Sequence, residues 1–262
     1  MDLSLVGRRA VVCGSSQGIG RAIATELAGL GCSVTVMARN PERLESVVQE
    51  LDTESNQDHT MIVADFSEAA QVKMGIDQFV SDGKSADILI NNTGGPPGGP
   101  AMEAAVPEFV AAFESHLLCN HLLMQAIVPG MKKKGYGRII NIISTSVKQP
   151  IRGLGVSNTI RGAVANWAKT LASELGPFGI TVNNILPGMT RTVRLDSIIN
   201  SRAEKSGMSI EEVTKNMESQ IPAGRIADAS EIANAAAFLA SPAAGYVNGV
   251  NLPVDGGRTG CL

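Results

Sequence analysis

Long hydrophobic runs and a large excess of either charge are both missing from this chain of 262 residues. No stretch of about 18 apolar residues is free of charge, so no membrane-spanning segment is expected. The opening sequence, MDLSLVGRRAVVCG, also lacks the basic, apolar and cleavage regions of a signal peptide. The formal net charge of −3 gives no reason to expect nucleic acid or an anionic membrane as a partner. We therefore expect a cytoplasmic protein.

Cysteine is scarce as well, and the four that occur are scattered at Cys13, Cys32, Cys119 and Cys261. No two of them form a C-x-x-C pair, so neither a disulfide framework nor a metal site is expected. The hydrophobic fraction of 44% excludes a disordered chain, and the length suffices for a substantial core.

Short apolar segments rich in Val and Ile alternate with helical patterns over almost the whole length. The expected strands are Arg9–Cys13, Ser33–Ala38, Thr60–Ala64, Ile88–Asn91, Arg138–Ser144, Ile180–Leu186 and Val250–Val254. The expected helices are Gly18–Leu30, Pro41–Leu51, Glu68–Ser81, Pro107–Lys134, Asn158–Leu175 and Ser230–Leu239. This alternation predicts a single α/β domain over residues 1–262, a Rossmann-type doubly wound parallel sheet of about seven strands with helices on both faces.

One segment, residues 193–221, interrupts the alternation between the sixth and seventh expected strands. It contains Ser209 and Glu212 at the spacing of a capping box, which predicts one or two helices over the carboxyl edge of the sheet. A lid that closes on a substrate and a solvated surface insertion are both compatible with this pattern.

A glycine-rich turn directly follows the first expected strand and leads into a helix. Glycines allow a tight turn and a close backbone approach, and the free N–H groups of the helix start favour a pyrophosphate. The spacing G-x-x-x-G-x-G therefore predicts a dinucleotide site made of Gly14, Ser15, Ser16, Gln17, Gly18, Ile19 and Gly20.

Arg39 follows the second expected strand, where sites that prefer NAD usually place a carboxylate for the ribose hydroxyls. A carboxylate repels a 2′-phosphate, whereas a guanidinium binds it with two hydrogen bonds. We therefore predict NADP(H) as the preferred cofactor, with NAD(H) as the alternative.

Further motifs occur in a fixed order along residues 5–258. Asn91-Asn92-Thr93-Gly94 follows the fourth strand, Ser144 ends the fifth, and Pro187-Gly188-Met189-Thr190-Arg191-Thr192 follows the sixth. Together with the glycine turn, Asp65, and the segments 221–225 and 254–257, they resemble the short-chain dehydrogenase/reductase family, and most of all its β-ketoacyl-acyl-carrier-protein reductase-like members.

This resemblance implies an NADP(H)-dependent oxidoreductase that acts on a small carbonyl or alcohol, such as a 3-oxoacyl thioester. It implies Ser144 as a catalytic residue and a homo-tetramer or homo-dimer formed through the long helices. It also implies that further contacts to the cofactor come from Asp65, Phe66, Asn92, Thr93, Gly94, Pro187, Gly188, Thr190 and Thr192.

The proton donor of the family is absent. The family places a Tyr 13 residues after the catalytic Ser and a Lys four residues later, and these positions hold Ser157 and Arg161. The only tyrosines are Tyr136 and Tyr246, which lie outside the expected site. The family's Asn, 28 residues before the Ser, is replaced by His116.

Three interpretations remain open. In a rebuilt site, Ser144 orients the carbonyl, Arg161 stabilises developing charge, and His116, with an unperturbed pKa near 6.5, supplies the proton. Alternatively, His116 packs beneath an inactive site, and the protein is a nucleotide-binding sensor or a partner subunit. In a third reading, Arg161 binds an anionic substrate for lyase or epimerase chemistry.

Overall fold

Seven parallel strands form the single sheet of the computed structural model, which describes residues 1–261. The strands are β1 (Arg9–Cys13), β2 (Ser33–Ala38), β3 (Thr60–Val63), β4 (Ile88–Asn91), β5 (Gly137–Ile142), β6 (Ile180–Pro187) and β7 (Asn251–Val254). Their spatial order is β3-β2-β1-β4-β5-β6-β7, so the order reverses between β1 and β4. The predicted Rossmann-type fold is therefore confirmed.

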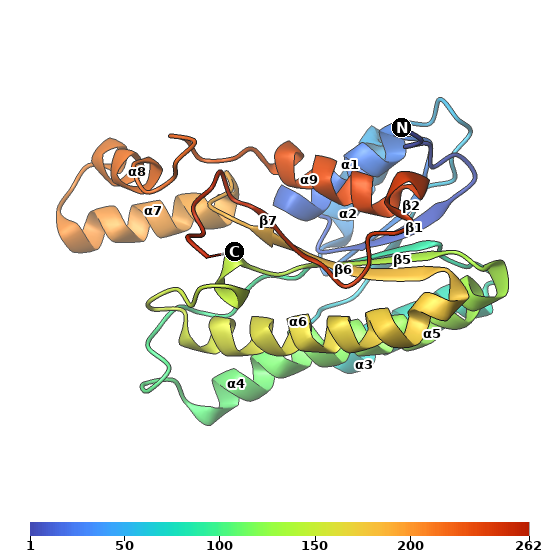
Figure 1. Cartoon of the computed structure of the whole chain (residues 1–262), viewed down its shortest axis with the longest axis horizontal. Helices are drawn as coiled ribbons and strands as arrows, with labels where there is room; N and C mark the ends of the chain where they lie inside the picture. The colour runs from blue at the N-terminus through green and yellow to red at the C-terminus, as the bar shows by residue number, and fades with distance from the viewer. Residues whose placement is uncertain (262) are drawn as a thin grey trace.

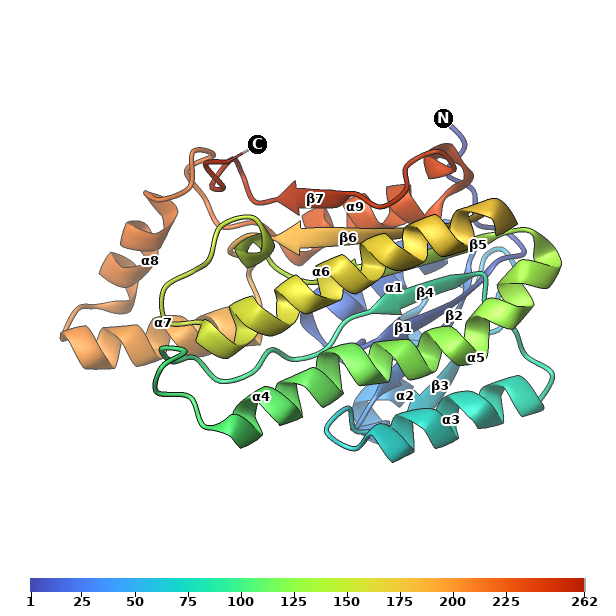
Figure 2. The ribbon, with the colours of Figure 1, turned by 60° about the horizontal axis from the view of Figure 1, so that its bottom comes forward.

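Helices cover both faces of the sheet (Figures 1 and 2). One face carries α1 (Gly18–Gly29), α2 (Pro41–Glu50) and α9 (Ala229–Ala240). The other carries α3 (Ala69–Ser81), α4 (Val106–Phe113), α5 (Cys119–Lys134) and α6 (Gly155–Leu175). Alternate strand residues serve the two cores, because successive side chains of a strand point to opposite faces. Val12 packs with Ile23 of α1, for example, while Val11 packs with Leu123 of α5.

A row of asparagines crosses the sheet near its carboxyl edge. Asn91, Asn141, Asn184 and Asn251 are register partners on β4 to β7. Each side-chain amide donates to the next along the row, and all three bonds measure 2.8 Å. A shift of one residue would break these buried bonds, so the row holds in register the strands whose loops carry the site.

The segment between β6 and α9 folds into two helices, α7 (Val193–Ser206) and α8 (Ile210–Glu218). The Ser209 hydroxyl accepts from the Glu212 N–H and the Glu212 carboxylate accepts from the Ser209 N–H, so the expected capping box is confirmed. The helices lie beyond the carboxyl ends of the strands (Figure 2) and share a small core. Its buried members are Leu195, Ile199, Val213, Met217, Ile221 and Ile226.

Two expected boundaries are wrong in ways that affect the site. The single helix predicted over Pro107–Lys134 is divided by a π-helical turn at Glu114–Leu118, between α4 and α5. The fifth strand ends at Ile142 rather than Ser144, so Ser144 lies beyond it as the N-cap of a 3₁₀ turn, Thr145–Val147. Two other short 3₁₀ turns occur at Gly176–Phe178 and Pro242–Ala244.

No helix within residues 1–261 combines the length and the apolar character needed to cross a membrane.

Candidate active site

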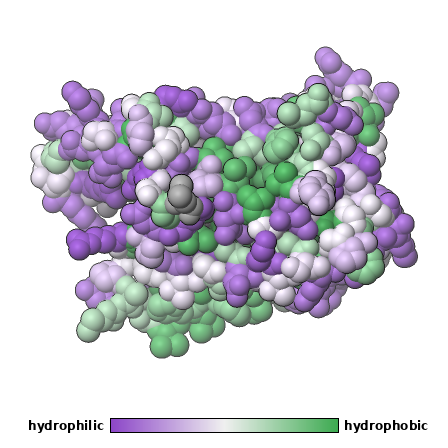
Figure 3. All heavy atoms as spheres, in the orientation of Figure 1, coloured by the Kyte–Doolittle hydropathy of each residue, from purple (hydrophilic) through white to green (hydrophobic). Residues whose placement is uncertain are grey.

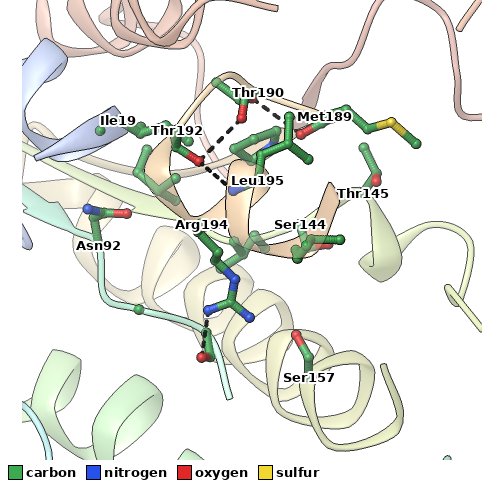
Figure 4. Close-up of a pocket in the computed structure, with 18 of the residues that line it drawn as sticks. Ile19, Asn92, Ser144, Thr145, Ser157, Met189, Thr190, Thr192, Arg194 and Leu195 are labelled. Carbon is green, nitrogen blue, oxygen red and sulfur yellow. Dashed lines mark hydrogen bonds between the residues drawn. The ribbon is translucent and has the colours of Figure 1, made fainter. Parts of the chain in front are cut away.

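The loops that follow β1, β4, β5 and β6 enclose a cavity of about 390 Å³ at the carboxyl edge of the sheet (Figure 4). It lies where the strand order reverses, which is the usual position of a ligand in an open α/β sheet. Gly14, Gln17, Gly18 and Ile19 of the glycine turn line one part of it, and Ser144, Ser157 and Arg161 line another.

Close backbone approach explains the glycines of the turn. A Cβ at Gly14, whose φ is +59°, would lie 2.5 Å from the carbonyl oxygen of Asn92. Asn92 in turn donates from its amide to the carbonyls of Cys13 and Gly14, at 3.3 Å each. A Cβ at Gly18 would lie 3.3 Å from Cγ2 of Thr192. The turn, the loop after β4 and the loop after β6 therefore meet with room for a ligand but not for side chains.

Other residues of the turn support it from behind. Ser15 is fully buried, and its hydroxyl accepts a hydrogen bond of 2.9 Å from the Met37 N–H, which ties the turn to β2. Ser15, Ser16 and Gly20 do not line the cavity. Their direct contact with a cofactor stays a prediction.

The residues expected at the adenine end lie outside the cavity. Arg39 is largely exposed, with its Nη1 3.8 Å from Oδ2 of Asp65. Hydrogen bonds from Ser67, first of all its backbone N–H, and the neighbouring Arg39 lower the pKa of Asp65 although its partial burial opposes them. Phe66 packs against the core on the α3 and α5 side. Arg43, which the sequence reasoning missed, donates to Gln17 of the glycine turn at 3.0 Å.

The loop after β6 is held by short-range contacts (Figure 4). A Cβ at Gly188 would lie 2.7 Å from Cα of Asp255, so only glycine fits there. The hydroxyl of Thr192 donates to the Thr190 carbonyl and accepts from the Leu195 N–H, both at 3.3 Å, which caps α7. Pro187, Gly188, Thr190 and Thr192 all line the cavity, as do Asn92, Thr93 and Gly94.

Ser144, at the start of the 3₁₀ turn after β5, and Ser157 of α6 point into the cavity (Figure 4). The Ser144 hydroxyl accepts from the Ser146 N–H at 3.1 Å, so its own proton is available to a ligand. Ser157 is nearly buried and lies on the first turn of α6, one helical turn before Arg161. Figure 4 shows both serines on the same side of the cavity as Arg194.

Arg161 is a buried cation. It is 8% exposed, and its only side-chain hydrogen bond within residues 1–261 runs from Nη1 to the carbonyl of Ile142, at 2.9 Å. Burial, and then the nearby Arg194, lower its pKa to about 10, so it stays protonated at neutral pH. Removal of such a charge from water is unfavourable unless an anion compensates for it.

Arg194 at the start of α7 was not singled out from the sequence. Its Nη1 donates to the Gly95 carbonyl at 2.6 Å, and its Nη2 donates to the Pro96 carbonyl at 3.0 Å. These bonds join the helical insertion to the glycine- and proline-rich loop after β4. No local sequence pattern shows how the segment that contains Arg194 packs against the rest of the protein. The one available signal was its position two residues after Thr192, which ends the loop after β6.

His116 has a different state from the one expected. It lies in the π-helical turn, is 2% exposed, and its Nδ1 is 2.6 Å from the hydroxyl of Thr93. Burial, with smaller contributions from Arg161 and Arg194, lowers its pKa to about 3. The expectation of an unperturbed pKa near 6.5 is therefore wrong. The imidazole is neutral at pH 7, and it reaches the cavity only through Thr93.

This depressed pKa has a consequence for stability. The unfolded chain takes up a proton at His116 near pH 6.5, while the folded protein does so only near pH 3. The unfolded state thus binds more protons below pH 6.5, and acid lowers the free energy of unfolding. Between pH 6 and pH 4, the free energy of unfolding should fall less in His116→Asn than in the wild type, by about 2 kcal/mol. Urea titrations at four pH values measure this, and equal slopes for both proteins would contradict it.

Both tyrosines of the chain lie outside the wall of the cavity. Tyr136 donates to the Ala240 carbonyl at 2.9 Å, and the guanidinium carbons of Arg8 and Arg138 lie 3.7 and 4.2 Å from its ring centre. It therefore has a structural role before β5, at the opposite edge of the sheet. Tyr246 is fully exposed. Neither side chain lines the cavity.

The comparisons with known proteins agree with this geometry. A family model described as enoyl-(acyl carrier protein) reductase matches residues 14–259. The NADPH-dependent reductase BacG of Bacillus subtilis is 31% identical over 95% of this chain and 97% of its own. The 3-oxoacyl-[acyl-carrier-protein] reductase FabG of Haemophilus influenzae is 32% identical over 96% and 98%. The structure of L-sorbose reductase from Gluconobacter frateurii with NADPH and L-sorbose has a TM-score of 0.94 at 30% identity, with both chains covered completely. The chain belongs to the short-chain dehydrogenase/reductase family.

Proposed function

We propose that this protein is an NADP(H)-dependent oxidoreductase that interconverts a small carbonyl compound and the corresponding alcohol. The observation that carries this proposal is the placement of the glycine turn, Ser144 and Arg161 around one cavity. The named activities of the relatives, NADPH-dependent reduction among them, support it. A 3-oxoacyl thioester, the substrate named for the FabG relative, is one member of this class.

The residues present fit a dinucleotide. A Cβ at Gly14 or Gly18 would narrow the part of the cavity beside the glycine turn. The N-terminus of α1 offers free N–H groups to a diphosphate. The loop over Pro187–Thr192, with Asn92, Thr93 and Gly94, would hold the nicotinamide half. Arg39 would bind the 2′-phosphate, with Arg43 one helical turn further along. NADPH, when bound, supplies the hydride.

The chain's own residues would act on the carbonyl oxygen. Ser144 donates a hydrogen bond to it, since the Ser144 hydroxyl proton has no partner within the described residues. The positive charge of Arg161 stabilises the negative charge that develops on the oxygen, an effect that is strong in a site shielded from water. Arg161 holds its proton too tightly to donate it, and Ser157 is too weak an acid, so the proton comes from water. His116, neutral and bonded to Thr93, positions the loop after β4.

We also propose that the protein assembles as a homo-dimer or homo-tetramer through α4 and α5. Exposed apolar side chains gather there, and Figure 3 shows apolar surface over α4 at the lower edge of the molecule. They include Val106, Val110, Phe113 and Leu118. A second copy of the chain would remove this surface from water.

Calorimetric titration with NADPH and NADH tests the cofactor assignment. We expect NADPH to bind the wild type more tightly than NADH does, and Arg39→Ala to weaken NADPH binding about 30-fold through loss of charge-assisted hydrogen bonds. NADH binding should change less than about threefold. Lys73→Ala, which removes a cation from the exposed side of α3, is the control. Failure of both nucleotides to bind would overturn the proposed function, and equal loss for both would remove Arg39 from the phosphate site.

A further inference from the structure

Within residues 1–261, four arginines line the cavity and no carboxylate does. Arg161, Arg194, Arg202 and Arg258 contribute to its wall, and no Asp or Glu is among its lining residues. None of the four forms an ion pair within residues 1–261. Most other arginines of the chain do, namely Arg8, Arg9, Arg21, Arg39, Arg191 and Arg225. The cavity therefore carries a positive charge that the described part of the chain leaves uncompensated.

Arg161 shows this imbalance most clearly. Its guanidinium is buried and has five N–H donors, of which only one has a partner in the part of the chain that the structure describes. The nearby Arg194 increases the excess of positive charge, since it lowers the pKa of Arg161 further. A buried cation with unused donors that face a cavity is the arrangement expected for an anion site.

The diphosphate of a dinucleotide is too far away to be this anion. The glycine turn follows β1, whereas Arg161 is bonded to the last residue of β5, and β4 lies between these strands. Adjacent strands are about 4.8 Å apart, so roughly 10 Å separates the two positions. The anion that compensates for Arg161 must then belong to the second ligand of the cavity.

We propose that the substrate is a 2-oxo acid, or the 2-hydroxy acid in the reverse direction, whose carboxylate binds between Arg161 and Arg194. The inference rests on the proposed function and names its substrate class. Arg161 lies one helical turn after Ser157, and it donates to the carbonyl of Ile142, two residues before Ser144. A carboxylate bound by Arg161 therefore lies beside the carbonyl that Ser144 contacts. A 2-oxo acid presents a carboxylate oxygen and a carbonyl oxygen side by side, which matches the planar fork of a guanidinium.

One part of the cavity wall is apolar and suits the remainder of such a molecule. Ile151, Leu154, Met189, Ile198 and Met217 line it without a polar side chain among them. An aliphatic tail on the 2-oxo acid would displace water from these side chains. In the reaction, the carbonyl carbon gains a hydride and NADPH is oxidised to NADP⁺, while the carbonyl oxygen gains a proton from water to give the 2-hydroxy acid.

Binding and turnover are measured with 2-oxo acids of three to eight carbon atoms. Each acid is compared with the matched ketone, in which a methyl group replaces the carboxylate. Calorimetry uses the full chain, free and saturated with NADP⁺, and turnover is followed by NADPH absorbance.

We expect at least one acid to bind, and kcat/KM for it to exceed that of its ketone at least 100-fold. Arg161→Met and Arg194→Met should each raise the Kd of the acid at least tenfold, and Arg161→Lys less than Arg161→Met. Arg152→Met, an exposed arginine outside the cavity wall, is the matched control.

The outcomes separate the two proposals. If NADP⁺ binds but no acid does, or if the ketones bind as well as the acids, the 2-oxo acid assignment is overturned and the proposed function stands. Binding of inorganic phosphate with the same dependence on Arg161, in place of the acids, would also overturn it. If the acids bind the free chain through Arg161 and Arg194 but NADP⁺ does not bind, the anion site is supported and the proposed function fails. Urea unfolding of each variant shows whether its fold is intact.

Discussion

Replacement of Arg161 by methionine is expected to make the protein more stable and less active at once. Burial lowers the pKa of this arginine from 12.5 to about 10, which corresponds to about 3 kcal/mol of unfavourable free energy for the charged form. Below pH 10 the arginine is charged in both the folded and the unfolded chain, so this cost is constant over the working range. Methionine has a similar length and no charge. We expect the free energy of unfolding to rise by about 1–3 kcal/mol, because the lost bond to Ile142 offsets part of the gain.

The same variant should lose activity, since the charge that stabilises the developing oxyanion is gone. We expect kcat/KM to fall about 100- to 1000-fold. Urea unfolding and NADPH oxidation, measured on one preparation, check both parts.

Arg138 offers a matched contrast for this experiment. It is also buried, but it donates to the carbonyls of Gly137, Gly179 and Ser241 and stacks on the ring of Tyr136. Arg138→Met should therefore destabilise the protein, by about 2 kcal/mol or more. If Arg161→Met and Arg138→Met lower the stability equally, Arg161 is an ordinary structural arginine and the functional reading of its burial is wrong.

Gly20→Ala is expected to abolish tight NADPH binding, whereas Gly29→Ala on the same helix should leave it unchanged. A Cβ at Gly20 would overlap the carbonyl oxygen of Gly14 and lie 2.7 Å from the Asn92 amide nitrogen. The first is a backbone atom of the glycine turn, and the second is held by hydrogen bonds to the carbonyls of Cys13 and Gly14, so neither can move aside freely. We expect a loss of about 2–3 kcal/mol in stability, and NADPH binding weakened at least 100-fold.

Gly29 is the control, because a Cβ there meets nothing within 4 Å. Alanine in a helix is favoured over glycine by about 0.5–1 kcal/mol, so this variant should be slightly more stable than the wild type. Calorimetric titration with NADPH and urea unfolding of both variants provide the comparison. Normal NADPH affinity in Gly20→Ala would show that the turn tolerates a side chain and that the close packing does not shape the site.

Patterns over a few residues of the sequence were sufficient to predict the strands, the glycine turn and the cap of α8. Runs of Val and Ile between helical segments predicted the parallel sheet, and all seven of its strands begin within one residue of the expected position. The strand β3 begins where expected and ends one residue early. The glycine spacing predicted the turn after β1, where the structure shows tight backbone contacts at Gly14. Ser209 and Glu212 predicted a cap that the structure contains. Each of these signals involves residues close together in the sequence, so it can be recognised without knowledge of the tertiary structure.

The chemical state of the site depended on residues far apart in the chain. His116 was expected to titrate near neutrality, but its pKa is lowered by burial and by two arginines, 45 and 78 positions further on in the sequence. The π-helical turn that holds it also has no local signature, because it adjusts α4 and α5 to their neighbours. Burial and the distances between charges follow only from the packing of the whole chain.

The sequence by itself determined the fold class, the position of the glycine turn after β1, and the presence of Ser157 and Arg161 four residues apart. Periodicity, glycine spacing and residue identity are properties of short segments, and they survive without tertiary contacts. Only the tertiary structure decided that Arg161 is a buried cation without an anionic partner among the described residues, that Arg194 joins it at the cavity, and that His116 is neutral. The physical reason is that electrostatic energy depends on solvent exposure and on distances through space, which the order of residues does not specify.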